Sequence, residues 1–183
     1  MNILKLQQLQ NSLSDLALHE EIIHRADLKD ALLSHGERMS SLLFSAVLNE
    51  YAVKAENFDV RNVLITDSEF GQAVPNLEQI GMAAKQLMLP ALADTVLVTQ
   101  GFVGADEQGN TTTLGRGGSD FTAALLAEAL NAQSCEIWTD VIGVYTTDPR
   151  ITEAARPLPE LSFEEAAEMA TFGAKVLHPA TME

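Results

Sequence analysis

The spacing of apolar residues changes along the chain, and each spacing predicts a different element. Leucine and isoleucine recur at helical intervals over residues 1–34, which predicts two helices joined near residues 24–27. Another helical pattern follows residues 34–36 and places Glu37 in its first turn, where the helix dipole favours a carboxylate. We expect the first two helices to serve as scaffold.

Strand and helix patterns interleave through the middle of the chain. Residues 58–65 alternate like a strand, and residues 77–88 return to a helical period. Residues 95–99 form the short β-branched run that is typical of a strand covered on both faces in a parallel sheet. The polar residues 106–110 predict a turn, and residues 111–114 predict the returning arm of a hairpin.

The last third of the chain continues this alternation. A glycine-rich turn at residues 115–120 opens a helix over residues 121–131, and residues 135–140 predict a brief strand. A loop is expected over residues 141–150, and residues 162–165 have the pattern of a capping box that starts another helix. The whole pattern predicts an α/β layered fold with binding loops at one edge of the sheet.

The strand patterns also predict a pairing. We expect residues 96–99 and 136–139 to be neighbouring or near-neighbouring strands of one central sheet, because both are short runs set between helices. Helices should then cover both faces of this sheet.

Composition and charge narrow the range of functions. The 183 residues are 46% hydrophobic and 20% charged, which suits one globular domain. A formal net charge of −15 would repel nucleic acid and an anionic membrane surface, so a small metabolite is the expected partner. No stretch approaches the roughly 18 apolar residues of a membrane span, and residues 1–10 lack a signal-peptide core. We therefore expect a cytoplasmic protein.

Cysteine and histidine positions predict neither a disulfide nor a metal site. Cys135 is the single cysteine, so an internal disulfide cannot form, and no Cys/His spacing resembles a zinc site. We expect Cys135 to be a buried thiol.

Basic residues are scarce after residue 85. They are Arg116, Arg150, Arg156 and Lys175, and three of these four lie in segments punctuated by Gly, Thr or Pro, where functional loops usually occur. Each of them can bind an anion or simply relieve repulsion among the many acidic residues, and both interpretations stay open.

Residues 115–120, Gly-Arg-Gly-Gly-Ser-Asp, form the strongest local candidate site. Glycines let backbone N–H groups approach an oxyanion at the start of a helix, and Arg116 adds a planar fork suited to a carboxylate or phosphate. The alternative is an ordinary tight turn with Ser119 as the N-cap. The Walker A lysine and the third glycine of the dinucleotide fingerprint are missing, and no G-x-S-x-G elbow supports a hydrolase built on Ser119 and His178.

Three further motifs follow one another along the second half of the chain. They are Thr-Thr-Thr-Leu-Gly-Arg-Gly-Gly-Ser-Asp-Phe-Thr-Ala-Ala at 111–124, Trp-Thr-Asp-Val-Ile-Gly-Val-Tyr-Thr-Thr-Asp-Pro-Arg at 138–150 and Phe-Gly-Ala-Lys-Val-Leu-His-Pro at 172–179. In this order and spacing they closely resemble the motifs of aspartate kinases, which are amino-acid kinases. The residues most like the lysine-sensitive, monofunctional bacterial type are 168–181, and the similarity extends over about residues 34–183.

The resemblance implies a three-layer αβα sandwich of the amino-acid kinase type, with a mostly parallel central sheet that is incomplete at both ends. Aspartate kinases begin with a phosphate-binding strand that leads into Lys-Phe-Gly-Gly-Thr, and they continue into ACT regulatory domains. Neither has a counterpart here, so residues 1–183 are expected to be a partial catalytic domain. Ile142 stands where the family often has a polar residue or proline, a change of slight expected consequence.

The resemblance also implies a reaction. Aspartate kinases transfer the γ-phosphoryl group of ATP to the side-chain carboxylate of L-aspartate and give 4-phospho-L-aspartate, the first step of lysine, threonine and methionine biosynthesis. Magnesium would arrive with ATP, no resident metal is implied, and the full-length protein is expected to be a homo-oligomer. Without the phosphate-binding strand, the 183-residue chain alone is expected to be inactive.

Site residues follow from the same motifs. The resemblance implies that Asp120 binds the amino group of aspartate and orders the reacting centre. It implies that the substrate is held by Glu37, Arg116, Gly117, Gly118 and Ser119, and that ATP is held by Thr139, Asp140, Tyr145, Arg150, Lys175 and Val176.

Two other classes of function stay open. One is an amino-acid kinase that acts on glutamate, acetylglutamate or a nucleoside monophosphate, although the first and third motifs together argue against it. The other is a non-catalytic module that binds a ligand or only self-associates.

Overall fold

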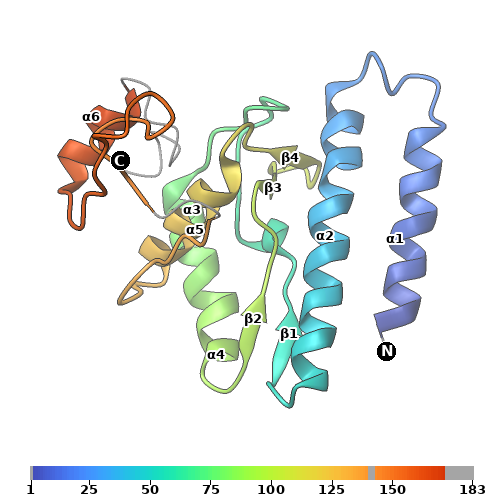
Figure 1. Ribbon diagram of the computed structural model, residues 1–183. Helices are drawn as coiled ribbons and strands as arrows, with labels where there is room; N and C mark the ends of the chain where they lie inside the picture. Colours follow the sequence, from blue (N-terminus) through green and yellow to red (C-terminus); the bar gives the residue numbers. More distant parts are fainter. Residues whose placement is uncertain (1, 140–142, 172–183) are drawn as a thin grey trace.

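The computed structural model describes residues 2–139 and 143–171, whose elements are shown in Figure 1. Helices α1 and α2 come first, and short strands and helices then alternate as far as α5. The elements are α1 Asn2–Ala17, α2 Ala26–Glu50, β1 Ala55–Asn57, η1 Val60–Asn62, α3 Leu77–Ala83, η2 Ala84–Met88, α4 Leu89–Leu92, β2 Val96–Val98, β3 Val103–Ala105, β4 Thr111–Thr113, α5 Gly118–Ala129 and α6 Phe163–Thr171.

The described strands form two pairs. Strands β1 and β2 run parallel, with Ala55 opposite Val96, and β3 and β4 form an antiparallel hairpin with Val103 opposite Thr113. The carboxylate of Asp106 closes the hairpin turn by accepting hydrogen bonds from the backbone of Asn110 at 2.8 Å and of Gln108 at 3.1 Å. The expected hairpin is therefore confirmed. The strand expected at residues 95–99 is present as β2, but Val96 is 48% exposed, so this strand is not covered on both faces along its whole length.

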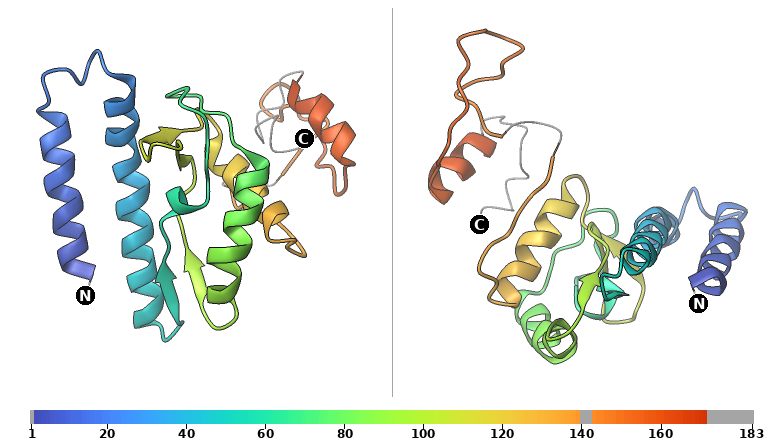
Figure 2. Two further views of the ribbon diagram at one scale, coloured as in Figure 1. Left: turned by 180° about the vertical axis from the view of Figure 1, so that it is seen from behind. Right: turned by 60° about the horizontal axis from the view of Figure 1, so that its bottom comes forward.

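Helices cover both sides of these strands. Helix α2 packs along β1, β2 and β4, whereas α4 contacts β2 and α5 contacts β3 from the other side. Helix α1 lies outside α2, and α6 lies on the side of the molecule far from α1 (Figures 1 and 2). This arrangement confirms the predicted α/β layers and the pair of N-terminal helices.

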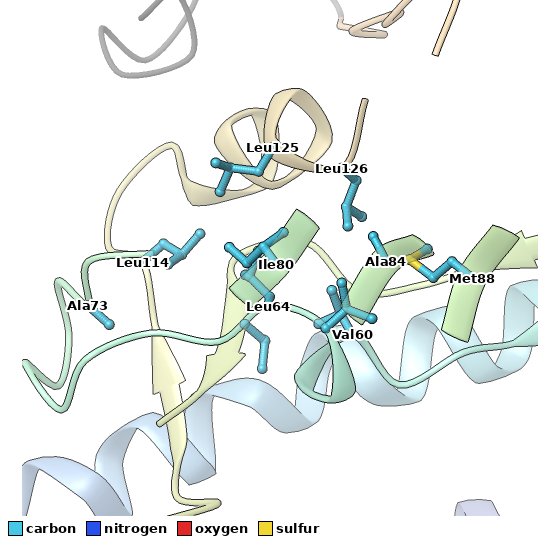
Figure 3. Close-up of a cluster of buried hydrophobic side chains, with 11 residues drawn as sticks. Val60, Leu64, Ala73, Ile80, Ala84, Met88, Leu114, Leu125 and Leu126 are labelled. Carbon is cyan, nitrogen blue, oxygen red and sulfur yellow. The ribbon is translucent and has the colours of Figure 1, made fainter. Parts of the chain in front are cut away.

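The core lies between the strands and the outer helices α3 and α5. Figure 3 shows Leu64, Ile80 and Leu125 converging from three different segments, and Leu64 and Ile80 are almost completely buried. Burying an aliphatic side chain of this size contributes about 1.5–3 kcal/mol. This core fixes α5 against β3, and it thereby fixes the turn that precedes α5.

One helix boundary was predicted wrongly. Helix α2 is unbroken from Ala26 to Glu50, so Glu37 lies in its middle and not in a first turn. The polar residues before Glu37 fit the helix because they bond to its own backbone: the Ser34 hydroxyl donates to the Ala31 carbonyl at 2.7 Å, and His35 Nδ1 lies 2.8 Å from the same oxygen. The dipole argument for Glu37 therefore does not apply.

The strand expected over residues 58–65 is also wrong. Strand β1 ends at Asn57, and the following residues form the short helix η1. Asp59 starts this turn, because its carboxylate accepts a hydrogen bond from the Arg61 backbone at 3.2 Å. The consecutive residues Val63 and Leu64 are both fully buried, which an alternating strand with one solvated face would not allow.

Residues 135–139 form no strand, which overturns the prediction that residues 136–139 lie beside β2. Trp138 is 88% exposed, and Cys135 is exposed as well, so the expectation of a buried thiol is wrong. A short apolar run becomes a strand only when a neighbouring strand pairs with it, and within the described residues β2 pairs with β1 alone.

The capping box at the start of α6 is confirmed. Ser162 Oγ accepts a hydrogen bond from the Glu165 backbone at 3.1 Å, and the Glu165 carboxylate accepts one from the Ser162 backbone at 2.9 Å. Across the described residues, no helix combines the length and the apolar character that crossing a membrane requires.

Candidate functional site

The glycine-rich turn at residues 115–120 joins β4 to α5. Gly115 and Gly117 have φ values of +77° and +78°, the left-handed region that glycine occupies without strain. Gly117 is the N-cap of α5, and Ser119 lies inside the first helical turn, so the alternative that made Ser119 the N-cap is wrong.

Close packing fixes this turn against the end of β2 and the start of β3. A Cβ atom on Gly101 would lie 2.9 Å from Ser119 Cα, and one on Gly118 would lie 2.9 Å from Leu114 Cβ. The buried Thr122 hydroxyl donates to the Gly118 carbonyl at 2.7 Å and accepts from the Phe102 backbone at 3.0 Å. The first turn of α5 therefore packs directly against residues 101 and 102.

The close approach at Gly115 gives a testable prediction. A Cβ atom on Gly115 would lie 2.9 Å from the Gly71 carbonyl oxygen, whereas one on Gly109, at φ +82°, would meet nothing within 4 Å. The left-handed backbone alone costs a non-glycine residue about 1–2 kcal/mol. We expect Gly109→Ala to lower the free energy of unfolding by about this amount and Gly115→Ala to lower it further. Urea unfolding followed by circular dichroism measures both, and equal losses would contradict the steric argument.

The charged side chains of the turn are accessible. Arg116 and Ser119 are exposed, and Asp120 is partly exposed in the first turn of α5. Within residues 2–139 and 143–171, Arg116 forms no ion pair. A guanidinium that forms no ion pair with the described residues, next to the N–H groups of a helix start, can bind a small anion.

Helix α2, which carries Glu37, is connected to this turn through Gln100 and the adjoining Gly101. No hydrogen bond or ion pair joins Glu37 to Arg116, but Ser41, one helical turn after Glu37, accepts a hydrogen bond from Gln100 Nε2 at 2.7 Å. Gln100 also accepts from the Val60 backbone at 2.9 Å, and the next residue is Gly101, which packs on Ser119. Helix α2 and the turn are thus held against the same short segment.

Arg38, the residue after Glu37, belongs to a charged group with Arg61 and Asp59. Burial and the nearby Arg61 both lower the pKa of Arg38 from its ordinary value. Burial alone would raise the pKa of Asp59, but the hydrogen bonds from Arg61, together with the positive charges of Arg61 and Arg38, hold that pKa below the usual value. Arg61 also donates to the Thr111 hydroxyl at 2.9 Å, so this hydrogen bond links η1 to β4.

The residues expected at the nucleotide are only partly described. Thr139 is exposed, Tyr145 is half-buried and pairs with Pro157 in an antiparallel bridge, and exposed Arg150 forms a two-point ion pair with Asp148. Asp148 raises the pKa of Arg150 through these hydrogen bonds and its charge. The other three residues lie outside the described part of the chain: Asp140, Lys175 and Val176.

Sequence reasoning missed two buried polar side chains at this site. Gln100 and Asp30 are each 2% exposed, and both bond to segments distant in the sequence. For Asp30, the sequence offered one indication of burial: an acidic residue stands among the apolar residues that recur at helical spacing. For Gln100, the only indication was its position just after a predicted strand.

Among the described residues, neither the surface hollows nor the acidic side chains define a second candidate functional site as well as the 115–120 turn does. One hollow lies beside the start of α3, lined by Asp67, Asn76 and Glu107 among others, and does not include the 115–120 turn. Among the described residues, no group of three or more His, Cys, Asp or Glu side chains is placed to hold a metal ion.

Comparison with known proteins agrees with this fold. Residues 3–183 match the amino acid kinase family, and the chain belongs to that family. It is 52% identical over 178 residues to the lysine-sensitive aspartokinase 3 of Escherichia coli (strain K12), which covers 97% of this chain and 40% of that protein. The chain therefore spans well under half the length of this relative.

Solved structures give the same result. The crystal structure of E. coli aspartokinase III in complex with aspartate and ADP, in its R-state, superposes with a TM-score of 0.92 over 97% of this chain and 40% of that one. The T-state complex of the same protein with lysine and aspartate gives 0.87 over the same shares. The amino-acid kinase fold is therefore confirmed for this chain.

Proposed function

We propose that the protein containing this chain is an aspartate kinase. It transfers the γ-phosphoryl group of ATP to the side-chain carboxylate of L-aspartate, which releases ADP and gives 4-phospho-L-aspartate. The observation that carries this proposal is the 52% identity and TM-score of 0.92 to a protein crystallised with aspartate and ADP. Phosphoryl transfer requires positioning and charge neutralisation more than a nucleophilic side chain, and the described turn offers both.

The 115–120 turn supplies the aspartate side in this proposal. The Arg116 fork binds a carboxylate of the substrate, and Ser119 with the backbone of Gly117 and Gly118 completes the cradle. Asp120 binds the amino group and orders the reacting centre. The exposed guanidinium, free of ion pairs within the described ranges, and the helix start beneath it support these roles.

Glu37 is the further acid proposed to bind aspartate, on α2. The segment of Gln100 and Gly101 supports this role. Gln100 bonds to Ser41 of α2, and Gly101 packs on Ser119 of the turn, so α2 and the turn contact the same segment without a direct bond between them. The neighbouring Arg38 keeps the local charge from becoming wholly acidic in a chain of net charge −15.

The nucleotide side is proposed to lie along the C-terminal motifs. Magnesium is proposed to arrive bound to the phosphates of ATP. The proposed nucleotide-binding residues are Thr139, Asp140, Tyr145, Arg150, Lys175 and Val176.

The wider setting of the protein is proposed from its relatives. The chain corresponds to part of a catalytic domain, and the protein is of the lysine-sensitive type, cytoplasmic and homo-oligomeric. The name of the E. coli relative supports the lysine-sensitive assignment.

A coupled assay tests the function. The natural protein that contains these residues is supplied with MgATP and L-aspartate, and ADP release and acyl-phosphate formation are both measured. Glutamate, acetylglutamate and a nucleoside monophosphate serve as alternative acceptors. Aspartate-dependent formation of both products supports the proposal, whereas turnover only with another acceptor, or binding without turnover, would replace it.

A further inference from the structure

Asp30 is a buried carboxylate to which the proposed chemistry assigns no role. It lies on α2, is 2% exposed and contacts Thr113 of the β3–β4 hairpin. Burying an ionisable carboxylate is costly unless it is paired or hydrogen-bonded. Among the described residues, no cation forms an ion pair with Asp30, so hydrogen bonds alone stabilise it.

Three hydrogen bonds satisfy this carboxylate. Oδ2 accepts from the Gly71 backbone at 2.8 Å and from the Thr113 backbone at 2.7 Å, and Oδ1 accepts from the Thr113 hydroxyl at 3.0 Å. One side chain of α2 therefore binds two segments that are 41 and 83 residues away in the sequence.

Both of these segments bear directly on the glycine-rich turn. Thr113 lies two residues before Gly115, at the end of β4. The carbonyl oxygen of Gly71 is the atom that a Cβ on Gly115 would meet at 2.9 Å. Asp30 thus fixes the strand that enters the turn and also the backbone against which the turn packs.

Asp30 is related to Glu37 by the geometry of the helix. Seven residues are about two turns of an α-helix, so Asp30 and Glu37 lie on nearly the same face of α2. The Asp30 carboxylate bonds α2 to the strand that leads into the turn. It therefore also sets the spacing between Glu37 and the segment that contains Arg116.

We propose that Asp30 is a positioning residue for the amino-acid subsite, which it sets by holding α2, the segment around Gly71 and the end of β4 in one arrangement. This inference rests on the proposed function. It assigns Asp30 no contact with the substrate, and its effect should fall on aspartate and not on ATP.

Kinetics of the natural protein that contains these residues test this proposal. Asp30→Asn keeps the size of the side chain but leaves one fewer acceptor for the two backbone N–H groups and the hydroxyl. Small misplacements of binding groups can reduce catalysis by up to about a hundredfold. We expect the KM for aspartate to rise about tenfold or more and the KM for ATP to stay within about twofold.

Asp106→Asn is the matched control. Asp106 is equally buried, at 4% exposed, and is satisfied by several hydrogen bonds, but it closes the far turn of the same hairpin. It should lower stability without changing the KM for aspartate selectively. A similar rise in the aspartate KM for both variants, or for neither, would overturn the positioning role.

A gentler pair of variants covers the case in which Asp30→Asn does not fold. Thr113→Val removes only the hydroxyl bond to Asp30, and Thr113→Ser restores it; the valine variant should raise the aspartate KM and the serine variant should not.

Amide hydrogen exchange at residues 113–119 gives a readout independent of turnover. Exchange should be faster in Thr113→Val than in Thr113→Ser, and no difference would overturn the inference. An unaltered protein that does not turn over aspartate refutes the proposed function instead, and the exchange result still decides the role of Asp30.

Discussion

Replacing Arg116 with alanine is expected to weaken aspartate binding by about 1.5–3 kcal/mol, the contribution of a hydrogen bond to a charged group. This corresponds to roughly a ten- to hundredfold rise in the dissociation constant. The reason is geometric as well as electrostatic, because the guanidinium offers two parallel donors to a carboxylate and no other described cation belongs to the 115–120 turn.

Two further variants distinguish the contribution of the planar guanidinium of Arg116 from the contribution of its positive charge. Arg116→Lys keeps the positive charge but loses the planar fork, so it should recover only part of the affinity. Arg156→Ala removes the same charge from another exposed position that has no proposed role, and it should leave the affinity unchanged. Calorimetry with aspartate on the natural protein measures all three. Equal losses for the alanine variants would indicate a general charge effect, and no loss for Arg116→Ala would remove this residue from the site.

Features encoded by adjacent residues were predictable. The hairpin at residues 103–113, the glycine-rich start of α5 and the capping box before α6 each depend on a few side chains and on backbone preferences within one short segment. The turn in the candidate site belongs to this group, because its glycines have φ values that few other residues adopt.

Features decided by tertiary contacts were not predictable. The apparent break at residues 34–36 is absent because Ser34 and His35 are buried and satisfied within α2. The run at residues 135–139 is no strand because, in the described part of the chain, nothing pairs with it. Both mistakes treat a local signal as decisive where the neighbours of a segment determine its structure.

The candidate site shows the same division. The residues of the glycine-rich turn come from one recognisable motif, but two buried side chains that fix its surroundings come from elsewhere. Asp30 of α2 bonds to Thr113, and Gln100, two residues after β2, joins Ser41 of α2 to Val60. Neither is near the motif in the sequence, and their contacts span 83 and 59 residues. Spacing along the chain carries no information about such contacts.

The largest expected effect concerns the 183-residue chain purified by itself. We expect its aspartate kinase activity to be at least about 10³-fold below that of the natural protein that contains it, because a single missing arginine finger already changes phosphoryl transfer by about 10³–10⁵. The Lys-Phe-Gly-Gly-Thr segment, which in aspartate kinases holds the transferring phosphate with a lysine and backbone amides, has no counterpart in these residues. The described lysines lie on α1, α2 and η2 and just before β1, and none is in the 115–120 turn.

We therefore expect this chain to retain aspartate binding while it loses most of its catalytic activity. Arg116 and the first turn of α5 are present and accessible, so weak aspartate affinity is expected to persist, whereas the charge that develops on the phosphoryl group lacks its stabilising lysine. A coupled assay with MgATP and aspartate measures turnover, and calorimetry on the same sample measures binding. Full-length E. coli aspartokinase III and its matching segment, 40% of its length, provide a parallel pair. Comparable turnover from either short chain and its full-length counterpart would show that another group of the short chain replaces the absent lysine.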